Sequence, residues 1–287
     1  MSAKIPDYPE TAEITIGMRP VLHPEFKRLA SEVSEFTFAS IYLFRKTHSY
    51  SVSALGEGNY LITGRDGDTP FFMLPFGLPE TEVLRGLFKQ YVSMKCVTGT
   101  QATELEKAGY KVTEDRDNFD YLYAGSDLSS LAGRRFHRKK NLVNFFTGHY
   151  NYEGKPLLDE YIPDALAVLE GWRRERDSEG DYEAAREALA MCTPLQLCGG
   201  IYYVDGKAAA YTLGEELGPK TFAIHFEKGL DRYKGLMQFV NLSFSSILTG
   251  LYDTVNREQD LGDEGLRKAK LSYRPTGFVK KYRASLA

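Results

Sequence analysis

Two groups of short extended runs, one in each half of the chain, constrain the fold more than any other feature. The runs lie at residues 50–55, 60–63, 71–74, 200–204, 208–214 and 221–227. Glycine and aspartate residues separate the runs within each group, which is the turn chemistry of an antiparallel meander. Asp205-Gly206 in particular is a two-residue hairpin signal. The sequence therefore predicts two sheets whose strands are mainly antiparallel.

Segments with apolar residues at helical spacing surround both groups of runs. We expect helices at 24–36, 79–91, 103–108, 161–172, 182–189 and 234–248, and further short strands around Cys96 and at 119–124, 251–255 and 278–282. Sheets flanked by helices make an α/β, or layered α+β, fold. Because 287 residues exceed a typical domain and the order of elements repeats, we expect tandem domains at 1–126 and 127–287.

The charge balance and the spacing of cysteine and histidine exclude several classes of protein. A net charge of −3 and a pI near 6.0 disfavour a dedicated nucleic-acid binder, so any basic site must be local. Cys96, Cys192 and Cys198 form no C-x-x-C pair and the histidines show no metal-ligand spacing, so we expect neither disulfides nor a metal. The first residues lack the features of a signal peptide, and no apolar run is long enough to span a membrane. We therefore expect a soluble, cytoplasmic protein.

A dense basic stretch follows Gly133. Phe136, Val143 and Phe146 keep one face of a helix apolar here, so the charges must gather on the remaining arc. Such a focused positive patch on an acidic protein suits the phosphates of a polyanion such as tRNA. The alternative is a solvated helix that links the domains. The expected polyanion-binding residues are Arg134, Arg135, Arg138, Lys139, Lys140 and Asn141.

Alternation along the run 221–227 places two ionisable side chains on one face. His225 and Glu227 lie opposite three apolar residues of the same strand. A buried histidine and a buried glutamate either line a cleft or form a satisfied pair in the core. Lys228 and Arg232 follow, together with the backbone N–H groups before the next helix, and this combination suits a phosphate or a carboxylate.

The segment 256–273 packs many ionisable groups into one short stretch. Polar residues crowd the end of the predicted strand 251–255, and Gly262 then breaks the chain. Acidic residues open and basic residues close the short helix that follows, as the helix dipole favours, and Pro275 ends it. This arrangement suits an anion or acyl-donor site at the end of a strand, and a solvated, salt-bridged helix is the alternative.

These three stretches resemble the family of the C-terminal catalytic domain of phosphatidylglycerol lysyltransferase. The residues that carry the resemblance are GRRFHRKKNLVNFF at 133–146, HFEK at 225–228 and NREQDLGDEGLRKAKLSYRP at 256–275. The resemblance covers most of the chain and implies two tandem GNAT-like domains, with the active site in the second. It also implies transfer of an aminoacyl group from aminoacyl-tRNA to an amine or a hydroxyl, as in the related lipid synthases and Fem-type enzymes.

Two features depart from the relatives. The chain lacks the multi-helix membrane portion of the full-length lipid synthases, so the expected location is the cytoplasm, with peripheral contact at the inner membrane surface for a lipid head group as acceptor. The segment 232–237 is similar to the coenzyme A signature of GNAT acetyltransferases, but Met237 stands where a small residue lets the pyrophosphate approach. We therefore expect no cofactor, and acyl-CoA stays an alternative donor.

The expected reaction assigns a role to each ionisable group. The cations bind phosphate or the developing oxyanion, and Glu227 or Asp260 orients or deprotonates the attacking group. The expected catalytic residues are Glu227, Asp260, Lys270 and Tyr273, and the expected substrate-binding residues are His225, Lys228, Arg232, Asn256, Arg257 and Glu258. CoA-dependent N-acetyl transfer is one alternative function, and a non-catalytic binding module for an anionic ligand is another.

Overall fold

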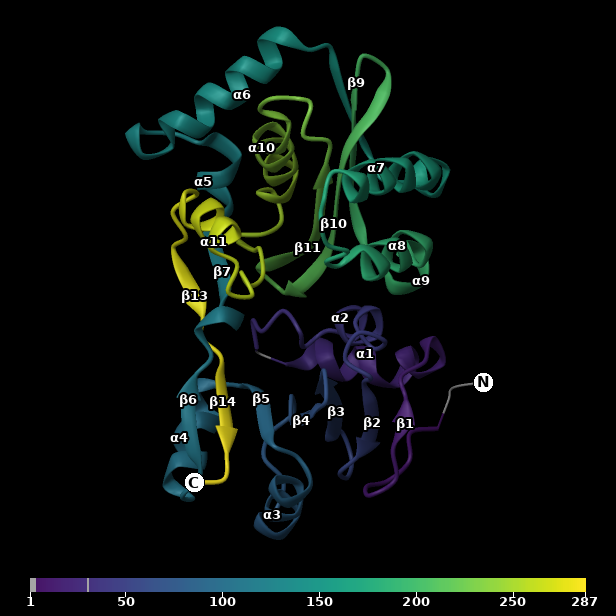
Figure 1. Ribbon diagram of the computed structural model, residues 1–287, viewed down its shortest axis with the longest axis vertical. Coiled ribbons are helices and arrows are strands. Elements are labelled where there is room, and N and C mark those ends of the chain that lie inside the picture. The colour runs from purple at the N-terminus through teal and green to yellow at the C-terminus, as the bar shows by residue number, and fades with distance from the viewer. Residues whose placement is uncertain (1–3, 30) are drawn as a thin grey trace. The chain divides into compact units, whose positions relative to one another are not determined.

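The computed structural model describes residues 4–29 and 31–287, which form two compact units (Figure 1). The first unit takes the described part of Met1–Asp120 together with Gln259–Gly262 and Val279–Ala287. The second unit takes Tyr121–Glu258 and Asp263–Phe278. Ala30, which the sequence places in a helix, lies outside the described residues, as do the first three residues of the chain.

The first unit is built on a mixed sheet. Its strands lie in the order β1 (Ala12–Glu13), β2 (Ser51–Ala54), β3 (Tyr60–Asp66), β4 (Thr69–Met73), β5 (Ser93–Val97), β14 (Tyr282–Ser285) and β6 (Lys111–Glu114). Only the pair β4 and β5 runs parallel among these described strands. Its helices are η1 (Ile16–Met18), α1 (Arg19–Arg28), α2 (Phe38–Leu43), α3 (Thr81–Gln90), α4 (Gly99–Lys107) and η2 (Arg116–Asn118).

Local sequence explains the helices that cover this sheet. The apolar face of α3 buries Leu87 and Phe88, and the Phe88 ring lies 5.1 Å from the ring of Phe72 in β4. Thr98 and Gln101 form a capping box that begins α4, because each side chain satisfies a backbone N–H of the first turn. The resulting core is apolar and belongs to the first unit alone.

The second unit is built on another mixed, mostly antiparallel sheet. Its strands lie in the order β13 (Gly277–Val279), β7 (Asp120–Ala124), β12 (Thr254–Asn256), β11 (Thr221–Gly229), β10 (Lys207–Gly218), β9 (Cys198–Val204) and β8 (Tyr152–Pro156). The pair β11 and β12 runs parallel. Its helices are α5 (Gly125–Ser130), η3 (Arg134–Phe136), α6 (His137–His149), η4 (Asp159–Tyr161), α7 (Ile162–Arg174), α8 (Tyr182–Ala190), α9 (Cys192–Leu195), α10 (Leu236–Leu248) and α11 (Glu264–Leu271).

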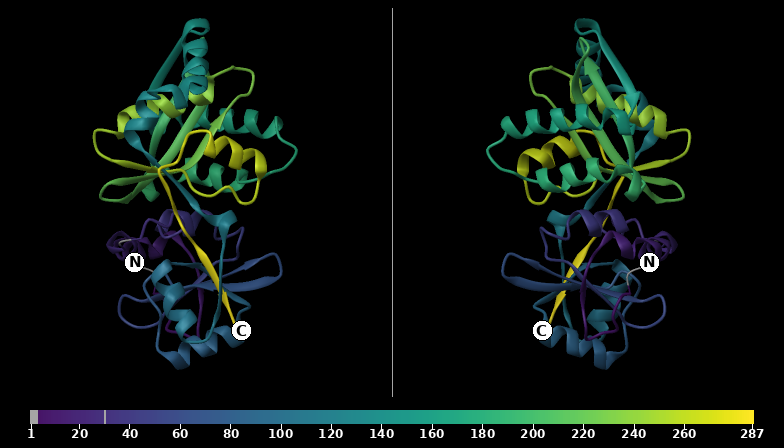
Figure 2. Two further views of the ribbon diagram at one scale, coloured as in Figure 1. Left: turned by 90° about the vertical axis from the view of Figure 1, so that its left-hand side faces the viewer. Right: turned by 90° about the vertical axis from the view of Figure 1, so that its right-hand side faces the viewer.

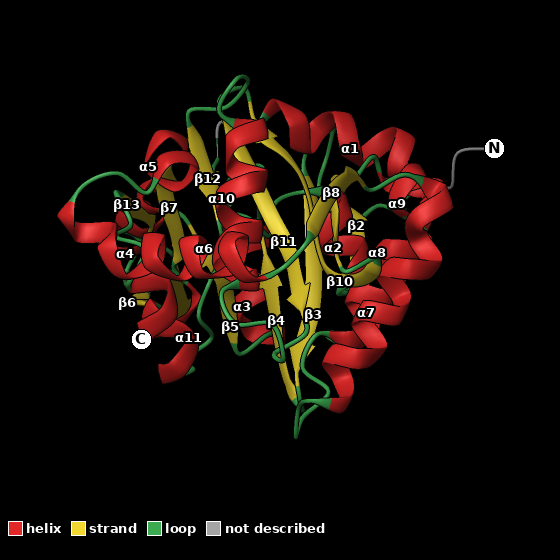
Figure 3. Cartoon of the chain, turned by 90° about the horizontal axis from the view of Figure 1, so that it is seen from above, coloured by secondary structure: helices red, strands yellow, loops and turns green. Residues whose placement is uncertain are grey.

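Helices cover both faces of the second sheet. On one face, a Cβ at Gly229 of β11 would lie 2.3 Å from the Met237 sulfur, so α10 packs directly on the strand. On the other face, the ammonium of Lys228 lies 4.0 Å from the ring centroid of Trp172 in α7. Figure 3 shows α10 and α7 on opposite sides of β11. The direction of each β11 side chain therefore decides which helix layer it meets.

Several predicted local structures are confirmed. The Asp205-Gly206 turn joins the antiparallel strands β9 and β10, with φ of 50° and 74° at its two residues. The predicted apolar face of the basic helix is buried at Phe136, Val143 and Phe146. No helix within residues 4–29 and 31–287 is both long and apolar enough to cross a membrane.

Some predicted boundaries are wrong. The first helix begins at Arg19, because Pro20 suits its first turn, and it ends at Arg28 rather than at residue 36. The strand predicted at 251–255 begins only at Thr254. The strand predicted at 278–282 is two strands, β13 and β14, which belong to different sheets. Lys281 lies between these two strands, and its side chain is buried against the carboxylates of Glu35 and Asp120 in the first unit.

The chain crosses between the units more often than a single boundary at 126/127 implies. The strand β7 lies wholly before residue 127 but pairs with β12 in the second sheet. The last strand, β14, returns to pair with β5 and β6 in the first sheet, as the yellow segment in Figure 2 shows. Sequence order does not reveal such pairings, because strand partners are chosen by burial in three dimensions.

Candidate active site

A bulge in β11 separates the two ionisable residues of that strand. The pairing of β10 with β11 shifts register between Leu213 and Gly214, which leaves His225 as an extra residue in β11. An extra residue resets the alternation of faces. Glu227 consequently faces α10 with Gly229, whereas His225 faces the other helix layer. The predicted shared face is wrong, because a bulge cannot be seen in the alternation of a sequence.

Glu227 forms a buried ion pair with Arg257, the residue that follows β12. Arg257 Nη2 donates a hydrogen bond to Glu227 Oε2, and the two side chains are 15% and 12% exposed. The guanidinium carbon lies 5.0 Å from the ring centroid of Tyr273 and 5.8 Å from that of Tyr123. The ion pair thus lies within an aromatic wall, where charges interact more strongly than in water.

The Glu227–Arg257 pair does not satisfy all of its own polar atoms. Arg257 Nε and Nη1 and Glu227 Oε1 are buried without a hydrogen-bond partner among the described residues. Each buried polar atom left unsatisfied costs about 1–3 kcal/mol, so native proteins keep few of them. Two N–H donors and one carboxylate oxygen of the pair are therefore left without a partner among the described residues.

Lys139 of α6 adds a second cation beside this pair. Its Nζ lies 4.2 Å from the ring centroid of Tyr273. Burial and then the positive charge of Arg257 lower the pKa of Lys139. Burial raises the pKa of Tyr273 to about 12, although the Arg257 guanidinium opposes this change. Two cations and a protonated phenol gathered in this way attract an anion or a developing negative charge.

Lys270 and Asn256 hold the backbone on both sides of Arg257. Lys270 Nζ donates to the carbonyl oxygens of Arg257 at 2.6 Å and of Glu258 at 3.1 Å. Asn256 Oδ1 accepts the N–H of Glu258 at 2.8 Å, where φ is 55°. The Tyr123 hydroxyl in turn donates to the Lys270 carbonyl at 2.8 Å. Lys270 therefore acts on the position of Arg257 through its backbone.

His225 lies between two carboxylates in a buried cluster. Its Nδ1 is 2.7 Å from Glu258 Oε1, and its Nε2 is 3.1 Å from Glu215 Oε1. Burial alone lowers the pKa of His225, but the charge of Glu258 and the hydrogen bonds to both glutamates raise this pKa to about 10. A histidine held as a cation between two acceptors fits the satisfied core alternative, with partners other than Glu227.

Lys228 and Arg232 lie away from the Glu227–Arg257 pair. Lys228 Nζ donates to both carboxylate oxygens of Asp181, at 2.6 and 2.8 Å, and packs on Trp172. Its ammonium is thus already engaged by the Asp181 carboxylate. Arg232 is exposed in the loop before α10, with its guanidinium carbon 4.9 Å from the Tyr233 ring centroid.

Asp260 belongs to the first unit. It is completely buried, its Oδ2 lies 3.3 Å from Arg116 Nη1, and its Oδ1 accepts the N–H of Gly262 at 3.0 Å. Both of these partners also belong to the first unit. The contacts of Asp260 are those of a loop anchor, and we leave it out of the candidate site.

The basic stretch divides into an inward and an outward part. Lys139 turns toward Tyr273, and Lys140 is partly buried. Arg135 forms an ion pair of 2.6 Å with Asp127 while remaining half exposed. The exposed members of the predicted set are Arg134, Arg135, Arg138 and Asn141.

The loop that is similar to a coenzyme A signature is filled by protein. Gly235 begins α10 with φ of 89°, and a Cβ there would lie 2.3 Å from the Leu142 carbonyl oxygen of α6. The Met237 side chain occupies the space beside Gly229. The backbone at the start of α10 is therefore covered by α6, which does not favour a bound pyrophosphate.

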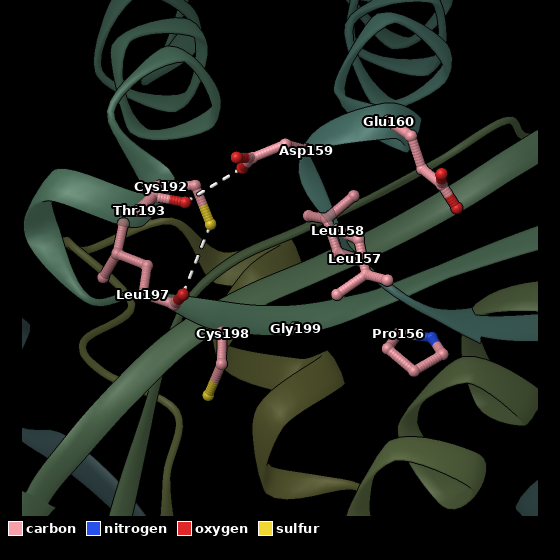
Figure 4. Close-up of a pocket in the computed structure, with 10 residues that line it drawn as sticks. All are labelled: Pro156, Leu157, Leu158, Asp159, Glu160, Cys192, Thr193, Leu197, Cys198 and Gly199. Atoms are coloured by element: carbon pink, nitrogen blue, oxygen red, sulfur yellow. Dashed lines mark hydrogen bonds between the residues drawn. The ribbon is translucent and has the colours of Figure 1, made fainter.

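A pocket of about 660 Å³ lies elsewhere in the second unit, beside η4, α9 and β9 (Figure 4). Thr193 Oγ1 donates to Asp159 Oδ1 at 2.9 Å, and the Cys192 thiol lies 3.3 Å from the Leu197 carbonyl oxygen. Burial raises the pKa of Cys192 to about 11, so its thiol is a poor nucleophile at neutral pH. Within the described residues, no three His, Cys, Asp or Glu side chains gather as metal ligands would.

Three residues of the candidate site were not predicted from the sequence. They are Tyr123, Gln238 and Tyr202. The Tyr123 ring lies near the Arg257 guanidinium, Gln238 forms a hydrogen bond with Tyr273, and Tyr202 interacts electrostatically with Glu227. Burial raises the pKa of Tyr202 to about 12, with a smaller effect from Glu227. No signal in the sequence marks Gln238, because helix α10 carries several other polar residues.

Comparison with known proteins places this geometry in a family. Residues 26–285 match the family described as phosphatidylglycerol lysyltransferase, C-terminal. The chain is similar to a conserved protein of unknown function from Bacteroides thetaiotaomicron, at 30% identity, with 96% of this chain and 99% of that chain covered and a TM-score of 0.87.

Two further solved structures share the fold. L-PGS from Bacillus licheniformis is 13% identical, with 99% of this chain and 94% of that chain covered and a TM-score of 0.65. A tandem GNAT protein from the clavulanic acid biosynthesis pathway is 11% identical, with coverages of 96% and 97% and a TM-score of 0.52. The predicted tandem GNAT-like fold is confirmed, and family and fold together support an acyltransferase. The match over 26–285 shows that the chain belongs to the phosphatidylglycerol lysyltransferase C-terminal family.

Proposed function

We propose that this protein transfers an aminoacyl group from aminoacyl-tRNA to the amine or hydroxyl of a small acceptor or lipid head group. The observation that carries the proposal is the convergence of Lys139, Arg257 and Tyr273, with two buried Arg257 donors that no described residue uses. A lipid acceptor would bring the protein to the inner membrane surface.

The proposed reaction is acyl transfer from an ester. The acceptor nitrogen or oxygen attacks the aminoacyl carbonyl carbon, and the ester bond to the terminal ribose breaks. Arg257 and the Tyr273 hydroxyl stabilise the oxyanion that forms, because preorganised donors in a buried site act strongly there. The unpaired Oε1 of Glu227 takes the proton of the acceptor, and that proton passes to the departing ribose oxygen.

The donor is assigned to tRNA because of the exposed basic residues of η3 and of the first turn of α6. Arg134 and Arg138 are exposed on a protein of net charge −3, so they form a local positive surface. Phosphate contacts by such residues supply affinity that falls as salt rises. Lys139 lies on the same helix as Arg138 and connects this surface to the Arg257 cluster.

The test measures transfer of a radiolabelled amino acid from charged tRNA to phosphatidylglycerol vesicles or to small amines. Tyr273→Phe keeps the ring but removes the hydroxyl, and we expect it to lower kcat by about 10-fold or more. Glu227→Gln keeps the shape of the side chain but removes the acceptor charge, and we expect a similar or larger loss. The matched control is Lys268→Gln, an exposed change on α11 that should leave the rate unchanged.

Two outcomes would contradict this proposal. Tight calorimetric binding of acetyl-CoA, together with no transfer from any charged tRNA, would favour N-acetyl transfer. Binding of tRNA without turnover, unaffected by Tyr273→Phe and Glu227→Gln, would favour a non-catalytic binding module.

A further inference from the structure

One stripe of α6 carries both positive charge and aromatic rings. Arg138, Phe145 and His149 are separated by seven and four residues, so they lie along one side of the helix. Arg138 and His149 are exposed and Phe145 is partly exposed. The ends of the stripe are eleven positions apart along the helix and so roughly 17 Å apart, which is long enough for a short stretch of single strand.

The rings in this stripe are already ordered as a stack. The centroids of Phe145 and His149 lie 3.9 Å apart, with 15° between the ring planes. His149 Nδ1 lies 2.8 Å from the Phe145 carbonyl oxygen, and it must be the donor because a carbonyl only accepts. This hydrogen bond holds the exposed imidazole in place. The protein would therefore lose little side-chain freedom when a base stacks on this ring.

The loop before α10 brings a further cation, Lys234, to this stripe. Lys234 Nζ lies 4.7 Å from the Phe145 ring centroid. The close contact of Gly235 with the Leu142 carbonyl holds this loop against α6. Arg232 lies over Tyr233 in the same loop. Exposed rings with cations beside them are the combination that binds unpaired nucleotides, through base stacking and phosphate attraction.

We propose that Phe145, His149 and Lys234 form a stacking site for an unpaired nucleotide of the donor RNA. This site rests on the proposed tRNA donor and goes beyond it by naming the part of the RNA that is bound. Its ligand is the unpaired 3′ end rather than the duplex, because ring faces are accessible only to bases outside a helix. Arg138, on the same stripe, contacts a neighbouring phosphate.

The experiment measures fluorescence anisotropy of two labelled RNAs, an intact tRNA and the same tRNA without its unpaired 3′ nucleotides. We expect His149→Ala and Phe145→Leu to weaken binding of the intact tRNA by about 5-fold to 100-fold, the range for loss of one stacked base. Neither variant should change binding of the truncated tRNA. The matched control is His137→Ala, an exposed histidine at the start of α6 that lies on another side of the helix.

Salt dependence separates the stacking site from the phosphate contact. Arg138→Gln should weaken binding of both RNAs and reduce the slope of log affinity against log salt by about one. His149→Ala should leave that slope unchanged. Equal binding of the intact tRNA by wild type and both ring variants would overturn the stacking site but leave the tRNA donor standing. Equal losses on intact and truncated tRNA would also overturn it. Failure of wild type to bind either RNA would refute the donor itself.

Discussion

The buried His225 cluster makes the stability of the second unit depend on pH. A pKa of about 10 lies about 3.5 pH units above the 6.5 of an unfolded histidine, which at about 1.4 kcal/mol per pH unit corresponds to about 5 kcal/mol. The folded state keeps a proton that the unfolded state releases above pH 6.5. The stabilisation is therefore complete below pH 6.5 and is lost as the pH rises toward 10.

The prediction is tested by urea unfolding between pH 6.5 and 8.5, a window below the titration of most tyrosines and lysines. The free energy of unfolding should fall by about 2 kcal/mol across this window because of His225. Trp172 is the one tryptophan in the sequence and belongs to α7, so its fluorescence reports unfolding of the second unit.

The control is the double variant His225→Gln with Glu215→Gln. It removes one buried charge of each sign, so the net charge of the cluster stays the same while the titrating proton disappears. We expect the double variant to be less sensitive to pH than wild type by about 2 kcal/mol over the same window. Parallel pH profiles for the two proteins would refute the reasoning, because His225 would then be neutral in the folded state.

Two further predictions concern stability. Lys281→Met should destabilise the first unit by about 3–5 kcal/mol at pH 7, because the buried Asp120 and the partly buried Glu35 lose the cation that they share. Chemical denaturation at pH 7 and pH 4 checks this, and an equal loss at both pH values would argue against an electrostatic cause. Gly235→Ala should cost about 1–3 kcal/mol, since φ is positive and the new Cβ would meet the Leu142 carbonyl. Gly148→Ala, where a Cβ meets no neighbour, is its control, and equal melting temperatures for the two variants would contradict the prediction.

Local patterns in the sequence predict much of the fold. The Asp205-Gly206 turn and the apolar face of the basic helix are short-range features, so periodicity and turn chemistry find them. The same reasoning places the ion pair partners Glu227 and Arg257 among the candidate site residues. It fails for the β11 bulge and for the split at Lys281, because both depend on pairing between segments distant in the chain.

The order of elements, the existence of two sheets and the stretches in which ionisable residues gather can all be predicted from the amino-acid sequence. Which members of each stretch act together depends on tertiary packing. Lys139 turns toward Arg257 and Tyr273 while Arg138 faces solvent, since neighbouring residues of a helix point about 100° apart and packing selects one direction for burial. In the same way, Lys228 and His225 are paired with Asp181 and with two glutamates that only folding brings near.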